Sequence, residues 1–174
     1  KGCFSVSKVF YMTDEFNEAV KERLNSLSRL AIEAASVTVR LQKFIEIIRE
    51  VLQARAALLL LPDDWPLAKR AWATGIDELL QEVLQDKGVQ NSLQQLLPMS
   101  EVFTETGLSQ PTCHEISDAR GQKQKVAIIS LALGPQRLGA IIVAGTGCET
   151  LRRENPLLVH LLAEQAALVL LVMK

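Results

Sequence analysis

The side chains of this sequence best suited to chemistry are three cysteines and two histidines. Cys3, Cys113 and Cys148 are widely spaced and form no C-x-x-C pair, so neither a zinc site nor a secreted disulfide framework is predicted. This cysteine usage favours a reducing, cytoplasmic setting. A reactive thiolate needs a basic neighbour, and the spacing predicts no nucleophile–base pair or cluster of metal ligands. We therefore expect no enzyme activity and no metal site, and the residues identify no cofactor.

The bulk composition is that of an ordinary globular domain. The chain has 174 residues, 48% of them apolar and 22% charged, with a formal net charge of -1. This charge balance gives no attraction to nucleic acid or to an anionic membrane. The most apolar stretch, Leu157–Met173, contains His160 and Glu164, which argues against a membrane span and against direct membrane contact. We expect the sequence to be a piece of a longer protein.

The elements that must position these side chains are centred on residues 125–145. Val126–Leu133 and Leu138–Ala144 are nearly continuous apolar runs, which is typical of strands covered on both faces. The turn signal Gly134-Pro135-Gln136-Arg137 makes them neighbours in an antiparallel hairpin. Gly139 lies early in the second run, where a glycine marks a bulge or a close backbone approach. We expect this hairpin to form the centre of the sheet.

Helices are predicted on both sides of the strand region. Thr13-Asp14-Glu15 has the features of a helix start, and an apolar seam follows it at three- and four-residue steps. A second helix is predicted at Val39–Gln53, capped by Ser36 or Thr38, so the two form one kinked helix or two consecutive ones. The last helix, Pro156–Met173, is apolar almost all round and must be buried on two sides.

The remaining segments are shorter. Asp77–Lys87 is predicted as a short helix that ends at Gly88, and Val89–Leu97 as a second short helix or an irregular segment. The patterns also predict four further strands, at Ala56–Leu61, Leu67–Thr74, Glu101–Thr106 and Thr112–Ile116. This order of elements predicts an α+β domain with an antiparallel sheet.

Four passages together resemble the GAF domain, the sensory module of histidine kinases, cyclic-nucleotide phosphodiesterases, phytochromes and enhancer-binding regulators. They are FIEIIREVLQARAALLLL at 44–61, EVFTETGLSQPTCHEISDAR at 101–120, the hairpin with Gly139, and the closing helix at 153–171. The resemblance implies a GAF-like (PAS-like) antiparallel sheet of about six strands, with the N- and C-terminal helices on one face and a ligand pocket on the other. It also implies an N-terminal arm and linker helix at 1–37 and the sensor domain at 38–174.

The resemblance further implies a regulatory small-molecule-sensing and dimerisation domain of a larger signal-transduction protein, such as a sensor kinase of a two-component system or a transcriptional regulator. A bacterial origin is the default for the family. The alternative is a ligand-free GAF-like scaffold that only dimerises its neighbours. A polar-lined pocket favours the sensor, and a pocket packed shut by its own side chains favours the scaffold.

We expect the pocket to be lined from the strand and loop segments that the resemblance places around it. The candidate residues are Trp72, Thr104, Cys113, His114, Glu115, Asp118 and Arg120. Asp118 and Arg120 have an alternative as a salt-bridged surface loop. The Cys113-His114 pair resembles the thioether anchor of bilin-binding members, which makes a bilin photosensor a further alternative. The simpler interpretation is a strand cysteine beside a polar histidine at the rim.

Other family ligands are less well supported. Two histidines far apart in sequence, His114 and His160, are weak support for a pair of haem ligands. The Asn-Lys-Phe-Asp-Glu signature of cyclic-nucleotide-binding members is absent, and the cysteines lack the Gly- and Cys-rich context of the GAF-like free methionine sulfoxide reductases.

The apolar helices also predict a partner. One sheet face cannot cover both the last helix and the seam of the first, so a second copy of the chain would bury the excess. The predicted homodimer interface comprises Leu24, Leu27, Ala31, Ala34, Leu161 and Leu168. The alternative is that flanking domains of the full-length protein cover these surfaces.

Overall fold

The structure is a computed structural model that describes residues 6–75, 81, 83–96, 111–117, 122–134, 136–145 and 156–174. Within these ranges it describes side chains from residue 18 onward, except those of residues 92, 94–96, 156 and 157. The helices are α1 Val6–Arg29, α2 Val37–Val51, α4 Lys87–Leu96 and α6 Pro156–Met173. The strands are β1 Ala56–Leu60, β2 Ala71–Gly75, β3 Thr112–Ser117, β4 Lys123–Leu133 and β5 Gln136–Ala144.

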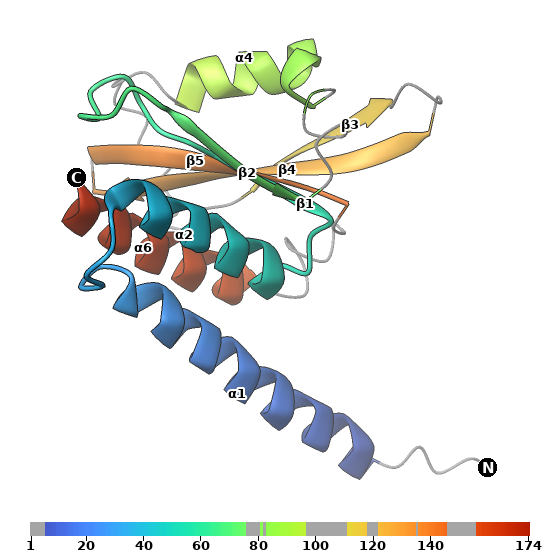
Figure 1. Ribbon diagram of the computed structural model, residues 1–174. Coiled ribbons are helices and arrows are strands. Elements are labelled where there is room, and N and C mark those ends of the chain that lie inside the picture. The colour runs from blue at the N-terminus through green and yellow to red at the C-terminus, as the bar shows by residue number, and fades with distance from the viewer. Residues whose placement is uncertain are drawn as a thin grey trace.

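The predicted hairpin forms the middle of an antiparallel sheet. The five described strands lie in the order β2-β1-β5-β4-β3, so β5 is central and β4 is its direct neighbour. The β4–β5 register pairs Val126 with Ala144 and Ile129 with Ile141. Figure 1 shows α2 and α6 side by side under one face of the sheet, α4 above the other face, and α1 beneath the helix layer. The predicted α+β architecture is therefore confirmed.

Each face of the sheet has its own apolar core, because successive strand residues point to opposite faces. In β4, Ile129 packs with the residues of α2 and α6, whereas Ile128 packs with the residues of α4. Both side chains are at most 1% exposed. The continuous apolar runs of the hairpin sequence are explained by this two-sided burial, as the sequence predicts.

Gly139 marks both of the features predicted for it. The β4–β5 register shifts between Leu131 and Ala132, which pair with Gly139 and Arg137, so Leu138 is the extra residue of a β-bulge. A Cβ atom added at Gly139 would lie 2.7 Å from the Leu60 carbonyl oxygen of β1. Only glycine allows the two backbones to approach this closely.

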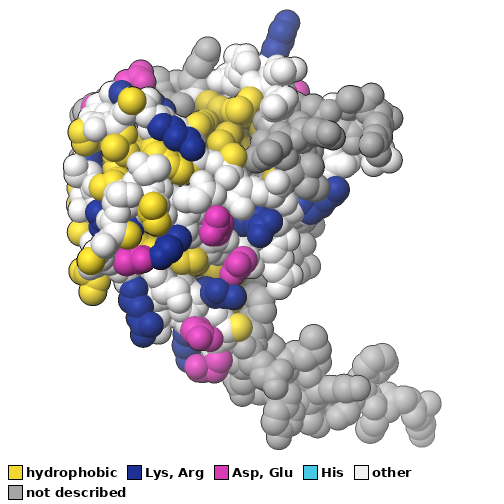
Figure 2. Space-filling model, viewed as in Figure 1, with side chains coloured by type: hydrophobic (Ala, Val, Ile, Leu, Met, Phe, Trp, Pro, Cys, Tyr) yellow, Lys and Arg dark blue, Asp and Glu magenta, His cyan; other side chains and the backbone are white. Residues whose placement is uncertain are grey.

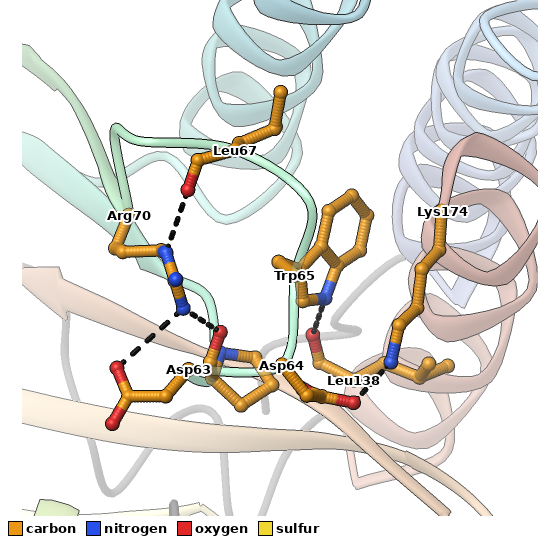
Figure 3. A network of polar contacts seen from close by, with 8 residues as sticks. Asp63, Asp64, Trp65, Leu67, Arg70, Leu138 and Lys174 are labelled. Carbon is orange, nitrogen blue, oxygen red and sulfur yellow. Dashed lines mark hydrogen bonds and ion pairs between the residues drawn. The ribbon is translucent and has the colours of Figure 1, made fainter.

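The connection between β1 and β2 is fixed by polar contacts that also support the bulge (Figure 3). Trp65 donates its indole N–H to the buried carbonyl oxygen of Leu138 at 3.2 Å, at the bulge residue. Arg70 donates to the carbonyl oxygens of Leu67 and Pro62 at 2.8 and 2.6 Å. Asp64 of the same connection forms an ion pair with Lys174 beyond α6. The loop is thereby held against β5 and the end of α6.

The helical boundaries differ from the predicted ones at several places. The first helix does not start at Thr13, because α1 already begins at Val6. Gly88 does not end a helix, since it lies in the first turn of α4. The Oδ1 atom of Asp86 accepts a hydrogen bond from the backbone N–H of Val89 at 3.0 Å, which is an N-cap. The N-cap signal of this aspartate therefore decides the local structure.

The other predictions are mostly confirmed. Of the two predicted alternatives, one kinked helix or two consecutive helices, the structure has two consecutive helices. Ser36 caps α2 by accepting a hydrogen bond from the N–H of Val39. The helix predicted at Pro156–Met173 and the strand predicted at Thr112–Ile116 are present, while β2 is shorter than predicted and begins at Ala71. The strand predicted at Glu101–Thr106 lies outside the described residues.

Candidate functional site

The sheet face beneath α4 is the face on which the resemblance places a ligand pocket. Asp86 and Gly88 at the start of α4 lie beside His114 of β3. A Cβ atom added at Gly88 would lie 3.1 Å from Asp86 Oδ1 and 3.4 Å from His114 Nδ1. The absence of a side chain at Gly88 thus allows the imidazole to lie close against the first turn of the helix. Asp86 and His114 are both half-buried, so they form a polar rim.

The floor below this rim is apolar. The buried side chains between α4 and the sheet are Ala56, Leu58, Val83, Val89, Leu93, Ile116, Val126, Ile128, Ala140, Ile142 and Ala144. None of them is more than 7% exposed, and the described residues include no buried polar or charged residue. The described part of this face is therefore filled by the side chains of the chain itself. A ligand here would meet apolar walls and contact polar groups only at the rim.

Cys113 and His114 are adjacent in the sequence but point to opposite faces of the sheet. Cys113 packs against the core between the sheet and the helices α2 and α6, and it is disulfide-bonded. The other cysteines of the sequence, Cys3 and Cys148, lie outside the described residues. The free strand thiol expected from the sequence is thus not observed. A disulfide-bonded sulfur on the far face from His114 does not match a thioether anchor.

Glu115 shares the face of Cys113 and is exposed. It pairs with Lys123 of β4 at 2.7 Å. The hydrogen bond from Lys123 lowers the pKa of Glu115, and the same contact raises the pKa of Lys123. Because both groups are exposed, this is an ordinary cross-strand ion pair.

Trp72 is also separated from the rim formed by Asp86 and His114. It is 1% exposed in the core between the sheet and the helix layer, and the Lys69 ammonium lies 5.4 Å from the centroid of its ring. The remaining candidates Thr104, Asp118 and Arg120 lie outside the described residues. Of the predicted site residues that the structure describes, only His114 lies on the α4 face. Asp86 was not predicted from the sequence, although an aspartate at the start of a helix is a recognisable N-cap signal.

The two histidines do not share a site. His160 lies on α6, on the other side of the sheet from His114, and its Nε2 atom is 3.4 Å from Glu164 Oε1 one turn along the helix. Among the described residues, no group of three or more His, Cys, Asp or Glu side chains is placed to hold a metal ion.

The helix layer presents an apolar surface of its own. Four exposed residues of α6, which we call the α6 stripe, are Leu161, Leu168, Leu171 and Val172, with exposed fractions of 46%, 47%, 39% and 63%. Their spacing places them along one side of the helix. Figure 2 shows hydrophobic side chains on the surface at the end of the molecule where α6 ends, with lysine and arginine side chains between them. Leu171 and Val172 were not predicted, although their helical spacing from Leu161 and Leu168 indicates them.

The predicted interface residues of the first helix have different environments. Leu27 is completely buried within the chain and Leu24 is half-buried against the same core. Ala31 and Ala34 follow the end of α1 and are half-buried and exposed, respectively. Among the described side chains, Leu24 and Leu27 of α1 are thus covered by their own chain, whereas the α6 stripe is exposed.

Comparison with known protein families finds no match, and comparison with curated proteins finds none either. Among solved structures, the fold is similar to the crystal structure of the A. Aeolicus nlh2 GAF domain in an inactive state. The superposition covers 91% of this chain and 99% of that domain, with a TM-score of 0.50 and 9% sequence identity. None of the described helices has the length and apolar composition needed to span a bilayer. The antiparallel sheet, its strand order and this similarity show that the chain has a GAF-like fold.

Proposed function

We propose that the chain is a regulatory domain of a larger signalling protein and that it forms a homodimer through α6. The GAF-like fold supports a regulatory role, and the family resemblance supports a host such as a sensor kinase or a transcriptional regulator. The α6 stripe is the observation that carries the dimer. A regulatory module of this kind acts by holding or moving its neighbours, so no catalytic group is required of it.

The chain itself covers only one side of α6. One side of this helix packs against the sheet and α1, and Val159, Leu162, Ala166 and Leu170 are all at most 1% exposed. The α6 stripe lies outside that buried side. Leu161 and Leu168 are seven residues apart and Leu171 follows three residues later, which is the spacing of a helix that packs against another helix. A second copy of α6 would remove these four side chains from water.

The test is the mass of the particle in solution. We expect size-exclusion chromatography with light scattering to give twice the chain mass of 19.2 kDa. Leu168→Lys should give a monomer, because a charge would then lie in the centre of the interface. Val39→Lys is the matched control, since Val39 of α2 has nearly the same exposed fraction, 46%, but lies off the stripe. A monomeric wild-type chain, or a dimer that persists in Leu168→Lys, would contradict the proposal.

Small-molecule sensing on the α4 face is the second candidate function. The polar rim formed by Asp86 and His114 above an apolar floor is the observation that favours it. The close packing of that floor instead supports the ligand-free dimerisation scaffold. Native and denaturing mass spectra of the same sample separate the two, because a bound ligand adds mass that is lost on denaturation. A ligand held at the rim should also be lost in His114→Ala and kept in Glu115→Ala.

A further inference from the structure

The C-terminal end of α1 is held by a charged side chain from α2. The last carbonyl oxygens of a helix have no partner within the helix and form the negative end of its dipole. Here the Nη1 atom of Arg40 donates to the carbonyl oxygens of Leu30 and Ala31, which follow α1, at 3.2 and 3.1 Å. These are charge-assisted hydrogen bonds, which are stronger than those between neutral groups. Arg40 therefore ties the turn that follows α1 to the first turn of α2.

The other polar contacts of α1 are weaker. Arg23 pairs with Glu50 at 3.0 Å, but both side chains are largely exposed, at 53% and 43%. Lys43 pairs with Glu33 at the same joint and is also exposed. Exposed pairs of this kind contribute little to stability. Arg40 is half-buried, and its Nε atom is buried without an acceptor among the described residues. Burying this arginine between α1 and α2 therefore costs desolvation free energy.

The described apolar contacts of α1 with the core lie at its C-terminal end. Among the described side chains from this region, Leu27 and Leu30 are buried in the core and Leu24 is half-buried against it. Ser28 adds a hydrogen bond to Gln165 of α6. Figure 1 shows the first turns of α1 extending away from the rest of the molecule. The direction of this long helix is therefore set by a short contact next to Arg40.

From these contacts we propose that Arg40 is a positioning residue that latches α1 to α2, and that α1 separates as a unit when the latch opens. The sheet and the other helices remain folded in the open state, because α1 supplies only Leu24 and Leu27 to their core among its described side chains. As a device for regulating the proposed signalling domain, the latch rests on the proposed function. The position of a partner or neighbouring domain attached through α1 would then depend on whether Arg40 keeps its hydrogen bonds.

Amide hydrogen exchange on the full chain tests the latch. In Arg40→Gln, we expect the amides of residues 24–32 to exchange about tenfold faster or more, since two charge-assisted hydrogen bonds are lost and a detached helix is marginal in water. The amides of β4 and β5 should keep their protection. Arg40→Lys retains a cation near the two carbonyl oxygens and should restore part of the protection. Arg49→Gln is the matched control, because the described structure shows no side-chain hydrogen bond or ion pair for Arg49.

Two results would overturn the latch. Unchanged protection of residues 24–32 in Arg40→Gln would show that Leu27 and Leu30 hold α1 without the arginine. Equal loss of protection in α1, β4 and β5 would show that Arg40 supports the whole fold. The exchange experiment needs neither a dimer nor a ligand, so a monomeric chain with selective exchange in α1 would remove the proposed dimer and leave the latch.

Discussion

Single side chains decide how the buried hydrogen bonds of the sheet are completed. The two tryptophans of the chain are 2% and 1% exposed and lie in the same core. Trp65 donates to the carbonyl oxygen of Leu138 at the bulge, whereas Trp72 Nε1 has no acceptor among the described residues. The bulge takes Leu138 out of register, and the indole of Trp65 supplies the partner that its carbonyl needs.

The two tryptophans therefore give a matched pair of substitutions. Trp65→Phe should lower the free energy of unfolding by about 1–3 kcal/mol beyond the change in ring size, because a buried carbonyl is left without a donor. Trp72→Phe removes a donor that has no acceptor among the described residues, and it should cost less than Trp65→Phe. Urea denaturation followed by circular dichroism measures both. Equal costs for the two variants would show that the hydrogen bond to Leu138 is not important.

At the scale of elements, the end of α6 is tied to the β1–β2 connection by the ion pair between Lys174 and Asp64. The hydrogen bond from Lys174 is the main cause that lowers the pKa of Asp64 below its ordinary value of 3.8. A carboxyl group with a lowered folded-state pKa stabilises the fold above that ordinary value. This contribution is lost as the pH falls through the folded-state pKa. The attachment of α6 should therefore weaken in acid.

Lys174→Gln should move the pKa of Asp64 back towards 3.8, because the cation that favours the carboxylate is gone. An NMR titration of the side-chain carboxyl carbon measures this shift, and the variant should lose less stability than the wild type between pH 4 and pH 2. Lys69→Gln is the control, since Lys69 lies in the same connection but contacts the ring of Trp72. An Asp64 titration that is the same in Lys174→Gln and in the wild type would contradict the assigned contact.

Across the whole molecule, one sheet separates two cores. The core between the sheet and the helix layer contains both tryptophans, and the core between the sheet and α4 contains neither. The two cores share every strand of the hairpin. We therefore expect them to unfold as one cooperative unit.

Neighbouring residues of β4 test this cooperativity. Ile128→Ala empties space in the α4 core and Ile129→Ala does so in the helix-side core, and each should cost about 2–5 kcal/mol. Tryptophan fluorescence and circular dichroism should give coincident transitions in both variants. A fluorescence transition that stays at its wild-type position in Ile128→Ala would show that the α4 layer unfolds separately from the rest.

The sequence by itself determined the elements whose signals are local. The bounds of α6 follow from a helical apolar pattern that begins at a proline. The presence of the central hairpin follows from its apolar, β-branched runs, and the bulge follows from Gly139. The N-cap of α2 at Ser36 is local in the same way. Prediction from local signals failed where two of them compete. Gly88 predicts the end of a helix, but Asp86 caps the start of α4, and the cap prevails.

Only the tertiary structure decided which side chains meet. The pleat of a strand turns Cys113 and His114 to opposite faces, but only the packing of the helices decides that Cys113 meets the core of α2 and α6 while His114 lies beside Asp86. Leu27 is covered by its own chain while Leu168 is not, although both belong to apolar helical stripes. A periodic pattern shows that a face is apolar, but what covers that face depends on elements distant in the sequence.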